Sequence, residues 1–274
     1  MRVALGQLPI SSDPSVNLER VRVAASAAAA QGADLVVFPE GTQARFSSDL
    51  PTVAEPLAGE FCAGLADAAK ANSLAVIAGV FEPAPHGRVF NTTVAFDRDG
   101  SLAAAYRKIH VFDALGHRES DSVTPGDEVV IASLAGLRVG FMTCYDVRFP
   151  ELARVLALGG ADLIVLPSAW AAGPFKEEHW VTLVRARAIE NTIWLAAAGQ
   201  VPDPAEPPTK AATGVGRSML VDPMGVVRLD LGPAEGVTSG DVDTQQTARV
   251  RAVLPCLVNR RADVLANWTA PSTS

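Results

Sequence analysis

The stretch Gly32-Ala-Asp-Leu-Val-Val-Phe-Pro-Glu40 decides the interpretation of this chain, because it returns later as Gly160-Ala-Asp-Leu-Ile-Val-Leu-Pro-Ser168. Each copy is a short apolar run that ends in Pro and a polar residue, which is typical of a buried strand that ends at the edge of a sheet. A repeated stretch of this kind indicates that one structural unit occurs twice in the chain.

The similarity continues beyond this stretch. Three further pairs occur in the same order: Met1–Gly6 with Leu137–Met142, Ser73–Gly79 with Thr192–Gly199, and Asp97–Gly100 with Asp222–Gly225. We therefore predict a single domain over about residues 1–270. It contains two halves, at about 1–105 and 136–231, an insertion at 106–135 between them, and a C-terminal tail at 232–274.

The apolar runs predict an α/β fold. Buried strands are expected at 3–8, 35–38, 74–78, 139–143, 163–166 and 193–197, and stretches with helical spacing separate several of them. If the two halves pack sheet against sheet with their helices outside, the result is a four-layer αββα sandwich. Loops are expected at 81–89 and 201–215, a strand and a helix at 237–242 and 244–253, and disorder at 271–274.

Charge and composition exclude several classes of partner. The formal net charge of -7 argues against binding to nucleic acid or to an anionic membrane surface. No window of about twenty uninterrupted apolar residues is present, and the N-terminus lacks the layout of a signal peptide. We therefore expect a cytoplasmic protein with a small-molecule substrate.

The three cysteines, Cys62, Cys144 and Cys256, form no C-x-x-C pair, so they suggest neither a disulfide framework nor a zinc site. Cys62 and Cys256 are interpreted as structural. Cys144 follows a predicted strand and precedes a helix that begins near Pro150. A thiol at such a strand-to-helix elbow can be exposed at the edge of a sheet, where a helix N-terminus favours the thiolate.

Glu40 ends one copy of the repeat, where partial removal from water strengthens a carboxylate as a base. Glu40 and Ser168 end equivalent strands, and Cys144 ends another. The two-half arrangement therefore predicts that Glu40 and Cys144 lie at one rim of the sandwich.

Three separated blocks carry a resemblance to a known family. They are Leu35–Glu40, Tyr106-Arg-Lys-Ile-His110, and Gly140-Phe-Met-Thr-Cys-Tyr-Asp-Val-Arg-Phe-Pro-Glu-Leu152. In this order they resemble the catalytic blocks of the nitrilase superfamily of carbon–nitrogen hydrolases. The third block and Arg185-Ala-Arg-Ala-Ile-Glu190 are most similar to the branch of deaminated-glutathione amidases and omega-amidases.

The resemblance implies an αββα sandwich and a Glu-Lys-Cys triad made of Glu40, Lys108 and Cys144. It also implies a second acid after the lysine block, which is Glu119 in the insertion. In the expected reaction Glu40 is the base, Cys144 is the nucleophile, and Lys108 stabilises the oxyanion together with the backbone N–H of Tyr145.

The expected activity is hydrolysis of a small, carboxylate-bearing amide to an acid and ammonia through a cysteine thioester. Candidate substrate-binding residues are Tyr145, Arg148 and Trp170, and Phe175 is a further candidate for the pocket wall. Hydrolysis of a nitrile or an N-carbamoyl compound by the same triad remains an alternative, as does a catalytically silent binding protein that retains the fold. A redox-sensing thiol protein is a weaker alternative, because no resolving cysteine lies beside Cys144.

No cofactor is expected, and the four histidines show no metal-ligand spacing, so no metal site is predicted. The family resemblance also implies a homodimer or a larger homo-oligomer.

Overall fold

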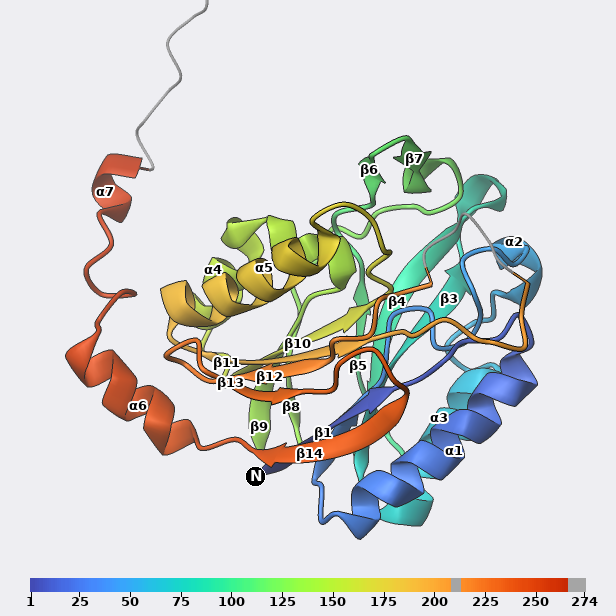
Figure 1. Cartoon of the computed structure of the whole chain (residues 1–274), viewed down its shortest axis with the longest axis horizontal. Coiled ribbons are helices and arrows are strands. Elements are labelled where there is room, and N and C mark those ends of the chain that lie inside the picture. Colours follow the sequence, from blue (N-terminus) through green and yellow to red (C-terminus); the bar gives the residue numbers. More distant parts are fainter. Residues whose placement is uncertain (208–212, 266–274) are drawn as a thin grey trace, which may run out of the picture.

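The structure is a computed structural model that describes residues 1–207 and 213–265. Within these residues two six-stranded sheets lie against each other (Figure 1). The first sheet has the order β14-β1-β2-β3-β4-β5, with β14 (Gly236–Asp241), β1 (Arg2–Gln7), β2 (Leu35–Val37), β3 (Ala75–Pro83), β4 (Val89–Phe96) and β5 (Leu102–Arg107). The second has the order β13-β12-β11-β10-β9-β8, with β13 (Val227–Asp230), β12 (Met219–Val221), β11 (Trp194–Gly199), β10 (Leu163–Ser168), β9 (Leu137–Phe141) and β8 (Ile131–Leu134).

The two sheets have the same topology. In the first, β1, β2 and β3 are parallel and are followed by antiparallel β4 and β5. In the second, β9, β10 and β11 are parallel and are followed by antiparallel β12 and β13. One further antiparallel strand completes each sheet, β14 beside β1 and β8 beside β9. The repeat in the sequence therefore corresponds to a repeat in strand order.

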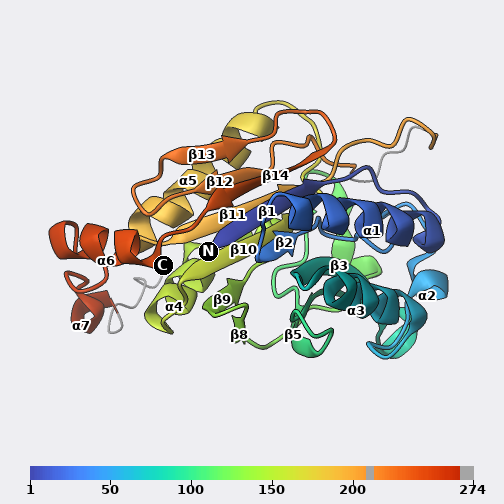
Figure 2. The same ribbon diagram turned by 90° about the horizontal axis from the view of Figure 1, so that it is seen from below.

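Helices cover both outer faces. Figures 1 and 2 show α1 (Pro14–Ala30) and α3 (Glu60–Asn72) on one side of the molecule, and α4 (Pro150–Leu158) and α5 (Lys176–Asn191) on the other. The predicted four-layer α/β sandwich is confirmed. Pro150 stands in the first turn of α4, where its missing N–H and fixed φ suit the start of a helix.

Alternation along the strands explains why they are apolar throughout. On β2, Leu35 and Val37 belong to the core cluster that is shared with the second sheet. Val36 and the following Phe38 belong to the cluster under α1 and α3. Because successive side chains point to opposite faces and both faces are covered, a continuous apolar run is required.

The predicted loop at 81–89 is too long at both ends. Strand β3 continues to Pro83, β4 begins at Val89, and only a turn with a 3-10 helix at Pro85–Gly87 separates them. The ladder between the two strands extends to the pair Pro83 and Val89. The two prolines misled the prediction, because one ends a strand and the other lies in the turn, so neither interrupts the ladder.

The tail adds β14, then α6 (Thr244–Val253) and α7 (Ala262–Leu265), which extend away from the sandwich in Figure 1. The predicted strand at 237–242 and helix at 244–253 are therefore confirmed. Part of the predicted 201–215 loop, residues 208–212, and the predicted disorder at 271–274 lie outside the described residues. Among the helices of the described residues, none has the length and apolar character needed to cross a membrane.

Candidate active site

Cys144 begins a short 3-10 helix, Cys144–Arg148, directly after β9, and its φ of 46° lies in the left-handed region. Residues other than glycine rarely adopt this backbone conformation, and residues strained in this way cluster at functional sites. The carboxylate of Asp146 holds the turn, because it accepts hydrogen bonds from the Thr143 N–H at 2.8 Å and the Tyr106 hydroxyl at 2.7 Å. The elbow is thus tied to β5 of the other sheet.

Glu40 follows β2 and is buried. Its Oε1 accepts hydrogen bonds from Lys108 Nζ at 2.9 Å and Asn91 Nδ2 at 2.8 Å. Its Oε2 accepts from the Ala169 N–H at 2.8 Å. Ala169 follows β10, the counterpart of β2, so the second half supplies a backbone donor to the carboxylate of the first.

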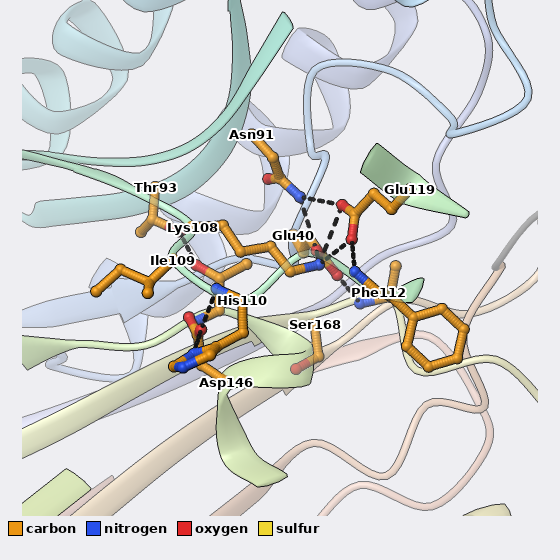
Figure 3. A network of polar contacts seen from close by, with 12 residues as sticks. Glu40, Asn91, Thr93, Lys108, Ile109, His110, Phe112, Glu119, Asp146 and Ser168 are labelled. Carbon is orange, nitrogen blue, oxygen red and sulfur yellow. Dashed lines mark hydrogen bonds and ion pairs between the residues drawn. The ribbon is translucent and has the colours of Figure 1, made fainter. Parts of the chain in front are cut away.

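Lys108 lies just beyond β5, between two carboxylates (Figure 3). Its Nζ is 2.9 Å from Glu40 Oε1 and 2.8 Å from Glu119 Oε2. Burial by itself would lower the pKa of Lys108, but the charges of Glu119 and Glu40 outweigh it and hold this pKa well above its usual value. Burial likewise opposes ionisation of Glu119, yet Lys108 keeps the pKa of Glu119 below its ordinary value. Lys108 is therefore a buried, charged ammonium.

The charges of Glu40 and Lys108 also act on the Cys144 sulfur. Burial raises the pKa of the Cys144 thiol most strongly, and the charge of Glu40 and a hydrogen bond to it raise this pKa further, against the opposing effect of Lys108. The resting sulfur is therefore a protonated thiol that faces a carboxylate. Cys62 differs, because it is buried in α3, where desolvation raises its pKa to about 12.

These groups face a pocket of about 480 Å³. Its polar wall consists of Glu40, Lys108, Glu119 and Cys144. The rest of the wall is formed by aromatic side chains, the 169–174 loop, the segment after Lys108 and one further lysine: Phe46, Phe112, Tyr145, Trp170, Ala169, Ala171, Ala172, Gly173, Pro174, Leu115, His117 and Lys176. The pocket is mostly apolar, with its charges concentrated at few points, which is typical of a small-molecule site.

The candidate substrate-binding residues lie in different places. Tyr145 and Trp170 line the pocket. Arg148 is not among the lining residues; its guanidinium lies over the Trp170 ring, 4.8 Å from the centroid, and its Nη2 is 3.4 Å from His179 Nδ1. Phe175, predicted as a possible wall residue, is 72% exposed and outside the lining, and its neighbour Lys176 lines the pocket instead.

Sequence reasoning missed Asn91. Its Nδ2 bridges Glu40 Oε1 and Glu119 Oε1, at 2.8 and 3.2 Å, so one amide holds two carboxylates beside Lys108. The only signal in the sequence was an asparagine among the residues that form β4. In the described part of the chain, no group of three or more His, Cys, Asp or Glu side chains could hold a metal ion.

Comparison with known proteins identifies the family. The sequence matches the family described as carbon-nitrogen hydrolase over residues 2–252. The chain belongs to this family. It is 41% identical over 268 residues to Hydrolase Rv0480c of Mycobacterium tuberculosis, with 95% of each chain covered. It is 37% identical to the deaminated glutathione amidase of Escherichia coli (95% of this chain and 97% of that one) and 36% identical to the omega-amidase of Mus musculus (96% of both).

Solved structures agree. The amidase of Nesterenkonia AN1, from the nitrilase superfamily, is 27% identical with a TM-score of 0.82, and the match covers 98% of this chain and 97% of that one. In a variant of that amidase, the acetamide moiety of fluoroacetamide is covalently attached to the active-site cysteine. The resemblance to the nitrilase superfamily is therefore confirmed, and the protein is an enzyme of the amidase and carbon-nitrogen hydrolase family.

Proposed function

We propose that this carbon-nitrogen hydrolase converts a small amide into a carboxylic acid and ammonia through a thioester on Cys144. Glu40, Lys108 and Cys144 are assigned as the catalytic residues and Glu119 as the acid that keeps Lys108 charged and in position. The observation that carries the proposal is the junction of four separate segments at one pocket: a buried lysine lies between two carboxylates, and the thiol at a strained elbow lines the same pocket.

The first half of the reaction uses the contacts at Glu40. Glu40 removes the proton from the Cys144 thiol as the sulfur attacks the amide carbon, because the thiol is the resting form. Negative charge develops on the carbonyl oxygen, and Lys108 Nζ with the Tyr145 N–H stabilises it. The tetrahedral intermediate collapses, the carbon–nitrogen bond breaks, and Glu40 returns the proton to the departing ammonia.

The second half repeats these steps with water. Glu40 takes a proton from a water molecule that attacks the thioester carbon. The carbon–sulfur bond then breaks, and Glu40 returns the proton to the sulfur, which regenerates the thiol and the carboxylate. Because Lys108 remains charged throughout, it stabilises both oxyanions without exchanging its own proton. Hydrogen bonds from Asn91 and the Ala169 N–H keep the Glu40 carboxylate oriented during both transfers.

Replacement of Cys144 tests the assignment. The Cys144→Ala variant should release no ammonia above background from any amide that the natural enzyme hydrolyses, and its melting temperature should stay close to that of the parent. Cys256→Ala is the matched control, because Cys256 is also partly exposed but lies in the tail. Mass spectrometry of the natural enzyme during turnover should detect an acyl adduct on Cys144. Turnover in Cys144→Ala would overturn the assignment of the nucleophile.

Nitrile and N-carbamoyl hydrolysis would use the same residues. A panel of amides, nitriles and N-carbamoyl compounds, compared by kcat/KM, separates the three activities. We expect the amides to be hydrolysed fastest, which the names of the deaminated glutathione amidase and omega-amidase relatives support.

We further infer a single-domain, cytoplasmic enzyme that assembles as a homodimer or larger homo-oligomer. The matched topology of the two sheets supports one folding unit, and a single cooperative unfolding transition would test it. Light scattering at micromolar concentration would report the assembly state.

A further inference from the structure

His110 contacts the elbow that carries Cys144, although the proposed reaction uses no histidine. Its Nδ1 is 2.7 Å from Asp146 Oδ1, and its backbone N–H donates to the same oxygen at 3.0 Å (Figure 3). His110 is not among the residues that line the pocket. Any effect of its side chain on the reaction must therefore act through the elbow.

Asp146 is a buried carboxylate that both segments share. Its Oδ2 accepts hydrogen bonds from the Thr143 N–H and the Tyr106 hydroxyl, and His110 occupies its Oδ1. The residue is 0% exposed, and in the described part of the chain no lysine or arginine forms an ion pair with it. Burial of such a carboxylate is unfavourable unless hydrogen bonds compensate for the lost water.

The hydrogen bonds around Asp146 define which ring nitrogen of His110 carries a hydrogen. The Tyr106 hydroxyl accepts a hydrogen bond from the Ile109 N–H at 3.3 Å, so its own hydrogen is free to point to Asp146. Burial, followed by the charge of Asp146, raises the pKa of Tyr106 well above its usual value, which keeps this hydroxyl a donor. A carboxylate that accepts these bonds has no hydrogen to give, so we assign a hydrogen to His110 Nδ1.

These bonds join the two segments that carry the proposed oxyanion donors. Two of the donors to Asp146 come from the residues two before and two after Lys108, and a third comes from the residue before Cys144. Asp146 itself follows Tyr145, whose N–H is the second proposed oxyanion donor. The carboxylate therefore connects the segment of Lys108 to the turn that holds the nucleophile.

The His110 ring also packs on the end of the elbow. It stacks on the Phe149 ring, with 3.7 Å between the centroids and 6° between the planes. The Phe149 ring in turn meets the Tyr145 ring edge-on, at 5.2 Å and 82°. His110 thus makes two separable contacts with the elbow, a hydrogen bond to Asp146 and a stack on Phe149.

We propose that His110 is a positioning residue, which through its Nδ1–H bond to Asp146 holds the Cys144 elbow in register with Lys108. This inference rests on the proposed function, because that function assigns the oxyanion to Lys108 and the Tyr145 N–H. His110 neither touches the substrate nor transfers a proton. Its hydrogen bond keeps nucleophile and oxyanion donors aligned, and a misplacement of about 1 Å in such an arrangement can cost roughly 10²-fold in rate.

Two substitutions of His110 separate its hydrogen bond from its stack. His110→Phe keeps an aromatic ring on Phe149 but removes the ring donor, whereas His110→Asn loses the ring but places an amide N–H near the position of Nδ1. With the amide of the panel that the natural enzyme hydrolyses fastest, kcat should fall by between about 10-fold and 100-fold in His110→Phe, while KM stays within about 3-fold. In His110→Asn, kcat should stay within about 3-fold of the natural value.

The opposite ranking would overturn the proposal. A loss of kcat in His110→Asn that equals or exceeds the loss in His110→Phe would assign the effect to packing, and an unchanged kcat in His110→Phe would remove the effect altogether. His86→Asn is the control, because His86 is an exposed histidine in the turn after β3, and it should change neither kcat nor KM.

A spectroscopic measurement tests the hydrogen bond without relying on a variant that must fold and turn over. Nitrogen-15 spectra of the imidazole groups in the natural enzyme at pH 7 should show a hydrogen on His110 Nδ1, with the His110 signal assigned by its loss in His110→Asn. An Nδ1 without a hydrogen would overturn the proposal, because Asp146 would then have no ring donor.

Alkylation of Cys144 separates the positioning role from the proposed hydrolysis. Iodoacetamide labelling, followed by mass spectrometry of the peptides, reports the rate at Cys144 against that at Cys256, a partly exposed thiol in the tail. The ratio should fall by about 10-fold in His110→Phe and stay within about 3-fold in His110→Asn. If the natural enzyme releases no ammonia from any amide but this pattern is found, the proposed function fails and the positioning role stands. Equal ratios in all variants of an enzyme that does release ammonia would overturn the positioning role alone.

Discussion

The two halves of this enzyme repeat the same strand order, yet their equivalent strand ends carry different chemistry. Strand β2 is followed by the carboxylate of Glu40, whereas its counterpart β10 ends at Ser168, whose hydroxyl donates only to the Leu166 carbonyl in its own strand. The next residue of the second half, Ala169, gives its N–H to Glu40. One half therefore provides the acid, and the equivalent position in the other half helps to hold it.

At the counterpart strands β1 and β9, the second half carries the reactive residue instead of the first. Alignment of Met1–Gly6 with Leu137–Met142 sets Leu8 against Cys144. Leu8 is a buried apolar residue of the first half, while Cys144 occupies the strained elbow. The comparison teaches that a duplicated framework brings equivalent strand ends to one rim. Each half then carries a reactive side chain at one strand end where the other half carries an unreactive residue.

The largest expected effect is on kcat, and it should distinguish Glu40 from Ser168, the residue at the equivalent strand end. Glu40→Gln should lower kcat for ammonia release by roughly 10²-fold to 10⁴-fold, because the proposed base and acid is lost. Ser168→Ala should retain kcat within about 3-fold, since within the described residues no hydrogen bond joins the Ser168 hydroxyl to the Glu40, Lys108 or Cys144 side chains. Steady-state kinetics on both variants provides the check. Similar losses in the two would contradict the assignment of Glu40.

The next largest effect is on the pH dependence of kcat/KM. It tests Glu119, which lies in the segment between the two halves. Glu119→Gln removes a charge that raises the pKa of Lys108, so this pKa should fall. Lys108 would then lose its proton at lower pH, and the alkaline limb of the kcat/KM profile should move to lower pH. Asp121→Asn, an exposed carboxylate on the same 3-10 turn, is the control and should leave the profile unchanged. An unmoved alkaline limb in Glu119→Gln would argue against the role of Glu119.

Two glycines, one on β3 and one on its counterpart strand β11, provide a smaller and more selective test. A Cβ at Gly79 on β3 would lie 2.3 Å from the Gly41 N and 2.8 Å from the Glu40 Cα, whereas one at Gly199 on β11 would lie 2.3 Å from the Gly216 carbonyl oxygen. Each alanine variant should lower the free energy of unfolding by about 1–3 kcal/mol, because backbone must shift.

Only Gly79→Ala should also lower kcat, since only that shift moves Glu40. Urea unfolding and steady-state kinetics together measure the two effects. The outcome that contradicts this comparison is a larger fall in kcat for Gly199→Ala than for Gly79→Ala.

The smallest effect tests a contact between segments of the two halves. Glu206 binds the hydroxyls of Ser11 and Ser12, the Ser12 N–H and the Arg45 guanidinium, and these hydrogen bonds lower the pKa of Glu206 to about 2. Glu206→Gln should lower the free energy of unfolding at pH 7 by less than about 1 kcal/mol, since solvent screens such pairs.

The sign of the pH dependence follows from the lowered pKa. The contribution of Glu206 is fully present above its ordinary pKa of 4.5 and is lost as the pH falls towards 2. Urea titrations at several pH values should therefore show the difference between Glu206→Gln and the parent shrinking on acidification. A difference that grows would contradict this account.

The sequence by itself determined the framework of this protein. The repeat of Gly32–Glu40 at Gly160–Ser168 predicts two equivalent strand ends, because burial on both faces of a strand leaves a local apolar pattern. The resemblance of the three blocks around Glu40, Lys108 and Cys144 to the nitrilase superfamily implies which residues meet at the rim. These inferences rely on the order of residues along the chain, which is visible without coordinates.

Only the tertiary structure decided how the pocket is completed. Asn91 and the Ala169 N–H reach Glu40 from other strands, and Lys176 faces the pocket because the start of α5 is fixed against Trp170. Neighbouring Phe175, the more obvious candidate in the sequence, is exposed instead. Contacts between distant segments depend on how sheets and helices pack, and no local pattern in the sequence encodes the direction in which one loop side chain points.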